Sequence, residues 1–126
     1  MRGLLDTSVF VAREQDRPVG ELPDEAAISV MTLAELHLGV MLAGEDRIRA
    51  LRLRTLAAVE RAFDPIPVDA DVARRFAELV AEARRARRRP KIIDTLIAAT
   101  ALATDVPVFT QDQGFEQFAL LRVHLV

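Results

Sequence analysis

Residues 3–11 read Gly-Leu-Leu-Asp-Thr-Ser-Val-Phe-Val, and this stretch sets the pattern of the chain. Gly3–Leu5 is a short apolar run that predicts a buried strand. Asp6 ends the run, and Thr7 and Ser8 are residue types that cap the start of a helix. A strand that passes into a helix, with a carboxylate at the junction, favours an α/β fold.

The same alternation continues to the end of the chain. Thr32 is predicted to cap one helix, with Glu35 three residues later in the capping-box position. Strands joined by connections of this length pair in parallel, and helices then cover both faces of the sheet. We therefore expect an α/β fold, as one domain over residues 1–126, around a mainly parallel sheet. The expected strands are 3–5, 26–30, 65–68, 106–110 and 122–126, and the expected helices are 7–11, 32–41, 45–63, 71–89, 92–103 and a short helix or turn at 112–118.

Composition excludes several kinds of site. The 126 residues include no cysteine and only two histidines, so disulfides, thiolate zinc sites and cysteine nucleophiles are excluded. Any metal would be a hard ion bound by oxygen. No apolar stretch reaches the roughly 20 residues of a membrane span, and Asp6 comes too early for a signal peptide. We therefore expect a cytoplasmic protein that does not enter a membrane.

One segment of the chain is strongly basic, although the net charge is −2. Such a cluster can contact a phosphate backbone. It can equally be the solvated end of a helix, where cations suit the helix dipole. The residues are Arg84, Arg85, Arg87, Arg88, Arg89 and Lys91.

Four acids share a predicted location. Asp6 and Asp112 follow strands, Glu35 follows a strand by one helical turn, and Asp94 lies in the most apolar helix of the chain. Ligands bind outside the carboxyl ends of parallel strands, so this edge of the sheet is the expected site. Each acid alone could instead be a helix cap or lie in a first helical turn, where the dipole favours it.

The convergence of four acids would require a counter-charge. Two carboxylates about 4 Å apart repel by roughly 4 kcal/mol at an effective dielectric near 20. A divalent cation removes this cost, orients a water and stabilises the attacking and leaving oxygens during phosphodiester hydrolysis. The hydroxyls of Thr7, Ser8 and Thr110 near the same edge suit a phosphate or an ordered water, or are ordinary caps.

These segments resemble the motifs of PIN-domain nucleases, including the VapC-like toxins of toxin–antitoxin pairs. Leu4–Ser8 is similar to the opening motif, in which apolar residues lead into Asp, any residue, and then Ser, Thr or Asn. Thr32–Leu36, followed by Gly39, resembles the second motif. Asp94–Ala101 resembles the third, and Thr110–Phe115 resembles the fourth. The motifs occur in the family's order and span nearly the whole chain.

The resemblance implies a three-layer α/β/α fold and RNA cleavage that depends on Mg²⁺ or Mn²⁺. It implies that Asp6, Glu35, Asp94 and Asp112 hold the metal and carry catalysis, with Ser8 and Thr110 in support. It also implies a small antitoxin as partner, and a homodimer. The chain departs from the family before Asp94, where glycine is common. Arg87, Arg88, Arg89 and Lys91 stand there instead and are candidate RNA contacts.

Three alternatives are weighed against this interpretation. A non-catalytic binding protein on the same fold could keep the acids as a metal or capping cluster. A phospho-acceptor receiver domain needs a lysine on a late strand, whereas the only lysine, Lys91, precedes a helix. A phosphatase of the Asp-x-Asp type is disfavoured because Ser8 replaces the second acid.

Overall fold

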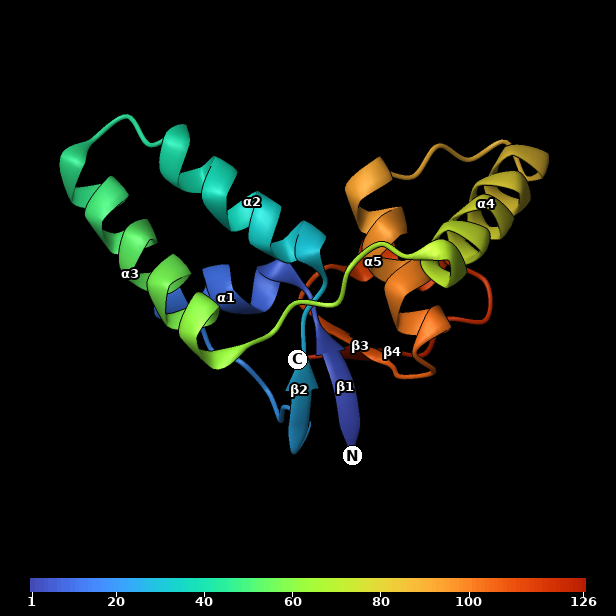
Figure 1. The fold of residues 1–126 in the computed structure, drawn as a ribbon, viewed down its shortest axis with the longest axis horizontal. Coiled ribbons are helices and arrows are strands. Elements are labelled where there is room, and N and C mark those ends of the chain that lie inside the picture. Colours follow the sequence, from blue (N-terminus) through green and yellow to red (C-terminus); the bar gives the residue numbers. More distant parts are fainter.

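The centre of the structure is a sheet of parallel strands. It is seen in a computed structural model that describes residues 1–126, and its strand order is β2-β1-β3-β4 (Figure 1). Gly3 pairs with Ala26, and Leu5 pairs with Phe109, which in turn pairs with His124. The predicted parallel sheet is confirmed. The strands are β1 (Arg2–Leu5), β2 (Glu25–Ala27), β3 (Val108–Thr110) and β4 (Val123–Leu125).

Consecutive residues of the two central strands point into different cores. Leu4 and Val108 belong to one buried cluster, whereas Leu5 and Phe109 belong to another. Successive side chains of a strand point to opposite faces, so the sheet separates the two cores. Both central strands are therefore apolar throughout, as is typical of a sheet covered on both sides.

Three helices cover one face of the sheet. These are α1 (Thr7–Glu14), α2 (Val30–Met41) and α3 (Asp46–Ala62), and Figure 1 shows α2 and α3 as a hairpin. Phe10, Leu36 and Val59 join these helices to the core on the Leu5 face. The predicted helices in this half are confirmed, with α1 longer than expected.

The predicted cap of α2 is wrong. Ser29 caps this helix, and its Oγ accepts the backbone N–H of Met31 at 3.0 Å. A parallel bridge to Ile66 holds Ser29 in the extended conformation that a cap requires. Thr32 is instead fully buried inside the first turn, where its hydroxyl lies 3.2 Å from that of Thr7.

Two helices cover the other face. They are α4 (Ala70–Arg85) and α5 (Ile92–Ala103), followed by the short 3-10 helix η1 (Gln113–Gln117). Ala98, Ala99 and Ala101 of α5 are fully buried, and their small size allows α5 to lie close to both the sheet and α4. None of the helices combines the length and apolar character that crossing a membrane requires. The three-layer α/β/α fold is confirmed.

The strand expected over residues 65–68 does not form. Only Ile66 pairs: its N–H donates to Ile28 at 2.8 Å, and its carbonyl accepts the N–H of Val30 at 3.0 Å. Pro65 and Pro67 flank it and have no N–H, so pairing cannot extend in either direction.

The turn after α4 begins inside the arginine segment. The N–H of Arg88 donates to the carbonyl of Ala83 at 2.7 Å, and that of Arg87 donates to Arg84 at 3.0 Å. These two hydrogen bonds close the end of the helix. Arg87 adopts the left-handed conformation (φ 58°) that glycine usually adopts at this position. The helix therefore ends at Arg85, and the remaining basic residues lie on a short loop.

Candidate active site

All four predicted acids line one pocket at the carboxyl edge of the sheet. Asp6 directly follows β1, and Asp112 lies just beyond β3. Glu35 lies in the second turn of α2 and Asp94 in the first turn of α5. We name this hollow of about 600 Å³ the acidic pocket. Its other lining residues are Thr7, Ser8, Val11, Arg17, Lys91, Ile92 and Ile93.

Asp6 is the most deeply held of the acids, with 4% of its surface exposed. It caps α1, because its Oδ2 accepts the N–H of Ser8 at 3.4 Å, and the same oxygen accepts the hydroxyl of Thr110 at 2.8 Å. Neither bond uses Oδ1, and no buried side-chain oxygen lacks a partner. Oδ1 therefore reaches the solvent of the pocket and is free to bind a ligand. Asp6 is a helix cap and a site residue at once.

Two hydroxyls hold Asp6 and the chain before Asp112 in place. The single proton of Thr110 is donated to Asp6, so Ser8, whose Oγ is 3.1 Å away, must donate to Thr110. Backbone N–H groups complete the arrangement: that of Asp112 donates to Thr110 at 2.9 Å, and that of Gln111 donates to Ser8 at 2.9 Å. The two hydroxyls thus position the acids through a directed chain of hydrogen bonds.

Glu35 is held by Thr7, whose hydroxyl the sequence suggested as a group for a phosphate or an ordered water, or as a helix cap. The hydroxyl of Thr7 donates to Glu35 Oε1 at 2.6 Å. Burial raises the pKa of Glu35, the Thr7 hydrogen bond opposes this rise, and the negative charge of Asp6 adds to it. Lys91 also lowers this pKa. The carboxylate of Glu35 is therefore fixed in direction while it remains half-exposed to the pocket.

Asp94 lies at the electrostatic centre of the pocket. The pKa of Asp94 rises from 3.8 to about 6, chiefly through burial and then through the charges of Asp6, Asp112 and Glu35, against the attraction of Lys91. No hydrogen bond to a protein group holds the carboxylate. The other three acids all act on this one group, so a cation beside Asp94 would relieve several repulsions together.

The donor set fits a hard divalent cation. It consists of carboxylate oxygens only, and Asp6 Oδ1 and the Asp94 carboxylate have no protein partner. No three acidic side chains lie close enough together to bind a common ion directly. Mg²⁺ characteristically takes one or two carboxylates and completes its shell with waters and substrate phosphate, which suits this spacing.

Comparison with known proteins assigns the fold to a family. The PIN domain matches residues 3–121. The chain belongs to the PIN-domain family. It is 46% identical over 115 residues to ribonuclease VapC5 of Mycobacterium tuberculosis, which covers 90% of this chain and 84% of the relative. It is 50% identical over 101 residues to ribonuclease VapC8 of the same organism, and the match covers 79% of this chain and 89% of that relative. The crystal structure of the toxin–antitoxin system VapBC-5 from that organism contains a chain that superposes on this one with a TM-score of 0.86 and is 41% identical to it. The match covers 99% of this chain and 97% of that chain.

Two cations line the acidic pocket of this PIN domain. Lys91 was predicted to contact RNA, and the structure places it in the wall beside Asp94. Arg17 was not predicted, because it lies in a polar loop with no recognisable motif. The backbone N–H of Arg17 donates to the carbonyl of Ala12 at 2.8 Å. This hydrogen bond closes the end of α1 and fixes the start of the loop. Both cations can attract a phosphate to the acids.

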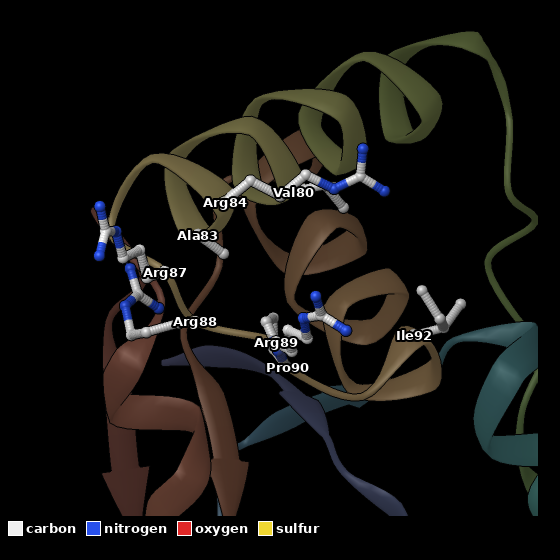
Figure 2. A pocket seen from close by; sticks show the side chains of 8 residues that line it. All are labelled: Val80, Ala83, Arg84, Arg87, Arg88, Arg89, Pro90 and Ile92. Carbon is white, nitrogen blue, oxygen red and sulfur yellow. The ribbon is translucent and has the colours of Figure 1, made fainter.

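The other predicted RNA contacts lie in a second hollow of the PIN domain. Arg87, Arg88 and Arg89 line it together with Arg84, and Figure 2 shows these side chains around the end of α4 and the loop to α5. Of the four predicted RNA contacts, only Lys91 lines the acidic pocket. The basic segment is thus divided between two sites.

Proposed function

We propose that this PIN domain is an endoribonuclease that hydrolyses RNA phosphodiester bonds with Mg²⁺ or Mn²⁺. One observation carries the proposal: four separate segments each bring a carboxylate to a single pocket at the carboxyl edge of the sheet. Relatives that are 46% and 50% identical bear the name ribonuclease, which supports the choice of substrate.

The residues divide the work as follows. Asp6 Oδ1 and Asp94, which have no hydrogen-bond partner in the protein, would hold the ion, and Glu35 and Asp112, whose carboxylates line the same pocket, would bind its waters. When bound, the ion supplies positive charge that offsets the carboxylates and stabilises the oxygens of the reacting phosphate. Thr110 keeps Asp6 Oδ2 occupied and so directs Oδ1 to the pocket. Lys91 attracts the phosphate to this position.

Cleavage assays test this proposal. Purified protein is incubated with total RNA and Mg²⁺ or Mn²⁺, and we expect cleavage that EDTA abolishes. Asp6→Asn and Asp94→Asn should each lower the rate at least 100-fold without loss of the fold. Asp71→Asn on α4, where the carboxylate is exposed, is the matched control and should retain the rate. A folded protein that cleaves no RNA with either metal would support a non-catalytic binding protein.

We propose further that the chain is the toxin of a toxin–antitoxin pair and that a small antitoxin binds it. The relatives named VapC and the VapBC-5 toxin–antitoxin crystal structure support this proposal. A test is growth arrest on expression, relieved when the protein encoded by the neighbouring reading frame is expressed with it. The homodimer, the cytoplasmic location and the single domain over residues 1–126 stay predictions, and sedimentation of the purified protein tests the homodimer.

A further inference from the structure

A second hollow lies beside the acidic pocket and is lined by arginines. We name it the arginine pocket; its volume is about 720 Å³, within the range of sites that hold small ligands. It is formed by the last turns of α4, the following loop and the first residue of α5 (Figure 2). The residues are Val80, Ala83, Arg84, Arg87, Arg88, Arg89, Pro90 and Ile92.

Three of the four guanidinium groups have no partner in the protein. Arg88 is bound to Glu82 at 2.5 Å and reaches Gln117 at 3.5 Å, whereas the side chains of Arg84, Arg87 and Arg89 form no hydrogen bond or ion pair. No acid lines the pocket. The charge of these three arginines is therefore available to an anion, and a guanidinium matches a phosphate with two parallel hydrogen bonds.

The remaining wall of the arginine pocket is apolar. Val80, Ala83, Pro90 and Ile92 supply it, and Ile92 is 60% exposed. A site that combines free guanidinium groups with an apolar surface suits a ligand with a phosphate and a flat base, since arginine also stacks on bases. An inorganic anion would use only the charged part of such a site.

The two pockets share a wall. Ile92 lines both of them, and the chain passes from one to the other just before it: Arg89 and Pro90 line the arginine pocket, whereas Lys91 lines the acidic pocket. In Figure 2, Arg84 and Arg89 extend toward the Ile92 end of the pocket. A strand whose phosphate lies at the acids can therefore continue over this wall and meet the free arginines.

We infer that the arginine pocket is a second RNA subsite, which binds the phosphate and base of a nucleotide that neighbours the scissile bond. The inference rests on the proposed nuclease function. Two features favour RNA over an acidic protein segment. The arginine pocket is continuous with the acidic pocket, and its apolar wall suits a base. Arg84, Arg87 and Arg89 are the contacts, while Arg88 holds the helix end through Glu82.

Binding and cleavage of RNA by matched variants test this inference. The test variant is Arg84→Gln, Arg87→Gln and Arg89→Gln together; the control removes the same charge from the exposed α3 residues Arg47, Arg54 and Arg61. With a 12-nucleotide RNA, the test variant should raise KM about tenfold and change kcat less than twofold. For a three-nucleotide RNA, KM should stay within twofold of the wild-type value.

Anisotropy of a labelled 12-nucleotide RNA in EDTA measures binding without catalysis. Loss of the charges that neutralise the phosphate in the arginine pocket should reduce the slope of log affinity against log salt by about 0.7, the contribution of one neutralised single-strand phosphate. The control should keep the wild-type slope. Equal KM and equal salt slopes in the two variants would overturn the inference. Unchanged RNA affinity with loss of polyglutamate binding would also overturn it, in favour of an acidic protein partner.

Two further results separate binding from folding and from catalysis. Arg87→Gly removes one charge at a left-handed position that favours glycine, so Tm should rise while RNA affinity falls about twofold to threefold. An unchanged affinity in this variant would count against the subsite. Absence of cleavage by the wild type, with arginine-dependent RNA binding retained, would refute the nuclease and leave the binding site in place.

Discussion

Asp94→Asn should make the metal-free protein more stable. The pKa of Asp94 rises from 3.8 to about 6 on folding, chiefly through burial and then through the charges of Asp6, Asp112 and Glu35. A change of this size corresponds to about 3 kcal/mol at neutral pH. Asp94 is partly exposed, so solvent screening reduces the figure to about 1.5 kcal/mol. Replacing the carboxylate with an amide removes this cost.

The pH dependence follows from the direction of the shift. Above pH 6 the carboxylate of Asp94 is ionised in both the folded and unfolded states, and the folded state bears the full cost. As pH falls from about 6 to about 4, the folded protein takes up a proton first, and the cost disappears. The wild type should therefore approach the stability of Asp94→Asn over this range and remain below it at pH 7.

Thermal and urea unfolding in EDTA between pH 4 and 8 measure the difference. At pH 7, about 1.5 kcal/mol corresponds to a Tm about 5 °C higher for Asp94→Asn in a domain of this size. Asp46→Asn is the control, because that carboxylate is fully exposed and removing it should change Tm by less than about 2 °C. A lower Tm for Asp94→Asn at pH 7, or a difference that does not vary with pH, would refute the electrostatic reasoning.

Three further predictions concern the metal, a hydroxyl and a glycine. Mn²⁺ at 100 times its Kd should stabilise the wild type by about 2.7 kcal/mol in unfolding experiments, and Asp94→Asn should show little of this gain; equal gains would place the ion elsewhere. Thr110→Val removes the hydrogen bond to Asp6 and should cost about 1–3 kcal/mol and most of the cleavage rate, whereas Thr110→Ser should restore both; a fully active Thr110→Val protein would contradict its positioning role. Gly3→Ala would place a Cβ 2.3 Å from the Phe109 ring and should destabilise the fold by about 1–3 kcal/mol. Urea unfolding measures this loss, and an unchanged midpoint would show that the ring moves aside.

The sequence predicts the fold where local and tertiary requirements agree. Leu4 and Leu5 form an apolar run because each faces a core, so the strand is visible without the structure. The acids also reach the predicted edge of the sheet, because carboxyl ends of parallel strands meet at one edge. The shared pocket of Asp6 and Asp94 follows from that rule and from the position of α5.

Other features depend on contacts between distant segments. Ser29 and Thr32 are both good caps, and the bridge from Ser29 to Ile66 decides between them. The Thr7 hydroxyl reaches Glu35 only after α1 and α2 pack together. Spacing along the chain does not predict that the basic segment is divided between two pockets. It also does not predict that Arg17 lines the acidic pocket.

The double duty of Asp6 has an evolutionary consequence. A descendant that has lost catalysis still needs a residue to begin α1 and to accept the Thr110 proton, so selection for a stable protein would retain an acid or an amide there. Asp94 has no such second task and lowers the stability of the metal-free protein, so drift would replace it early. Among descendants of this protein, the residue at position 94 therefore distinguishes an active enzyme from one that has lost catalysis. The residue at position 6 does not, because its structural role preserves it.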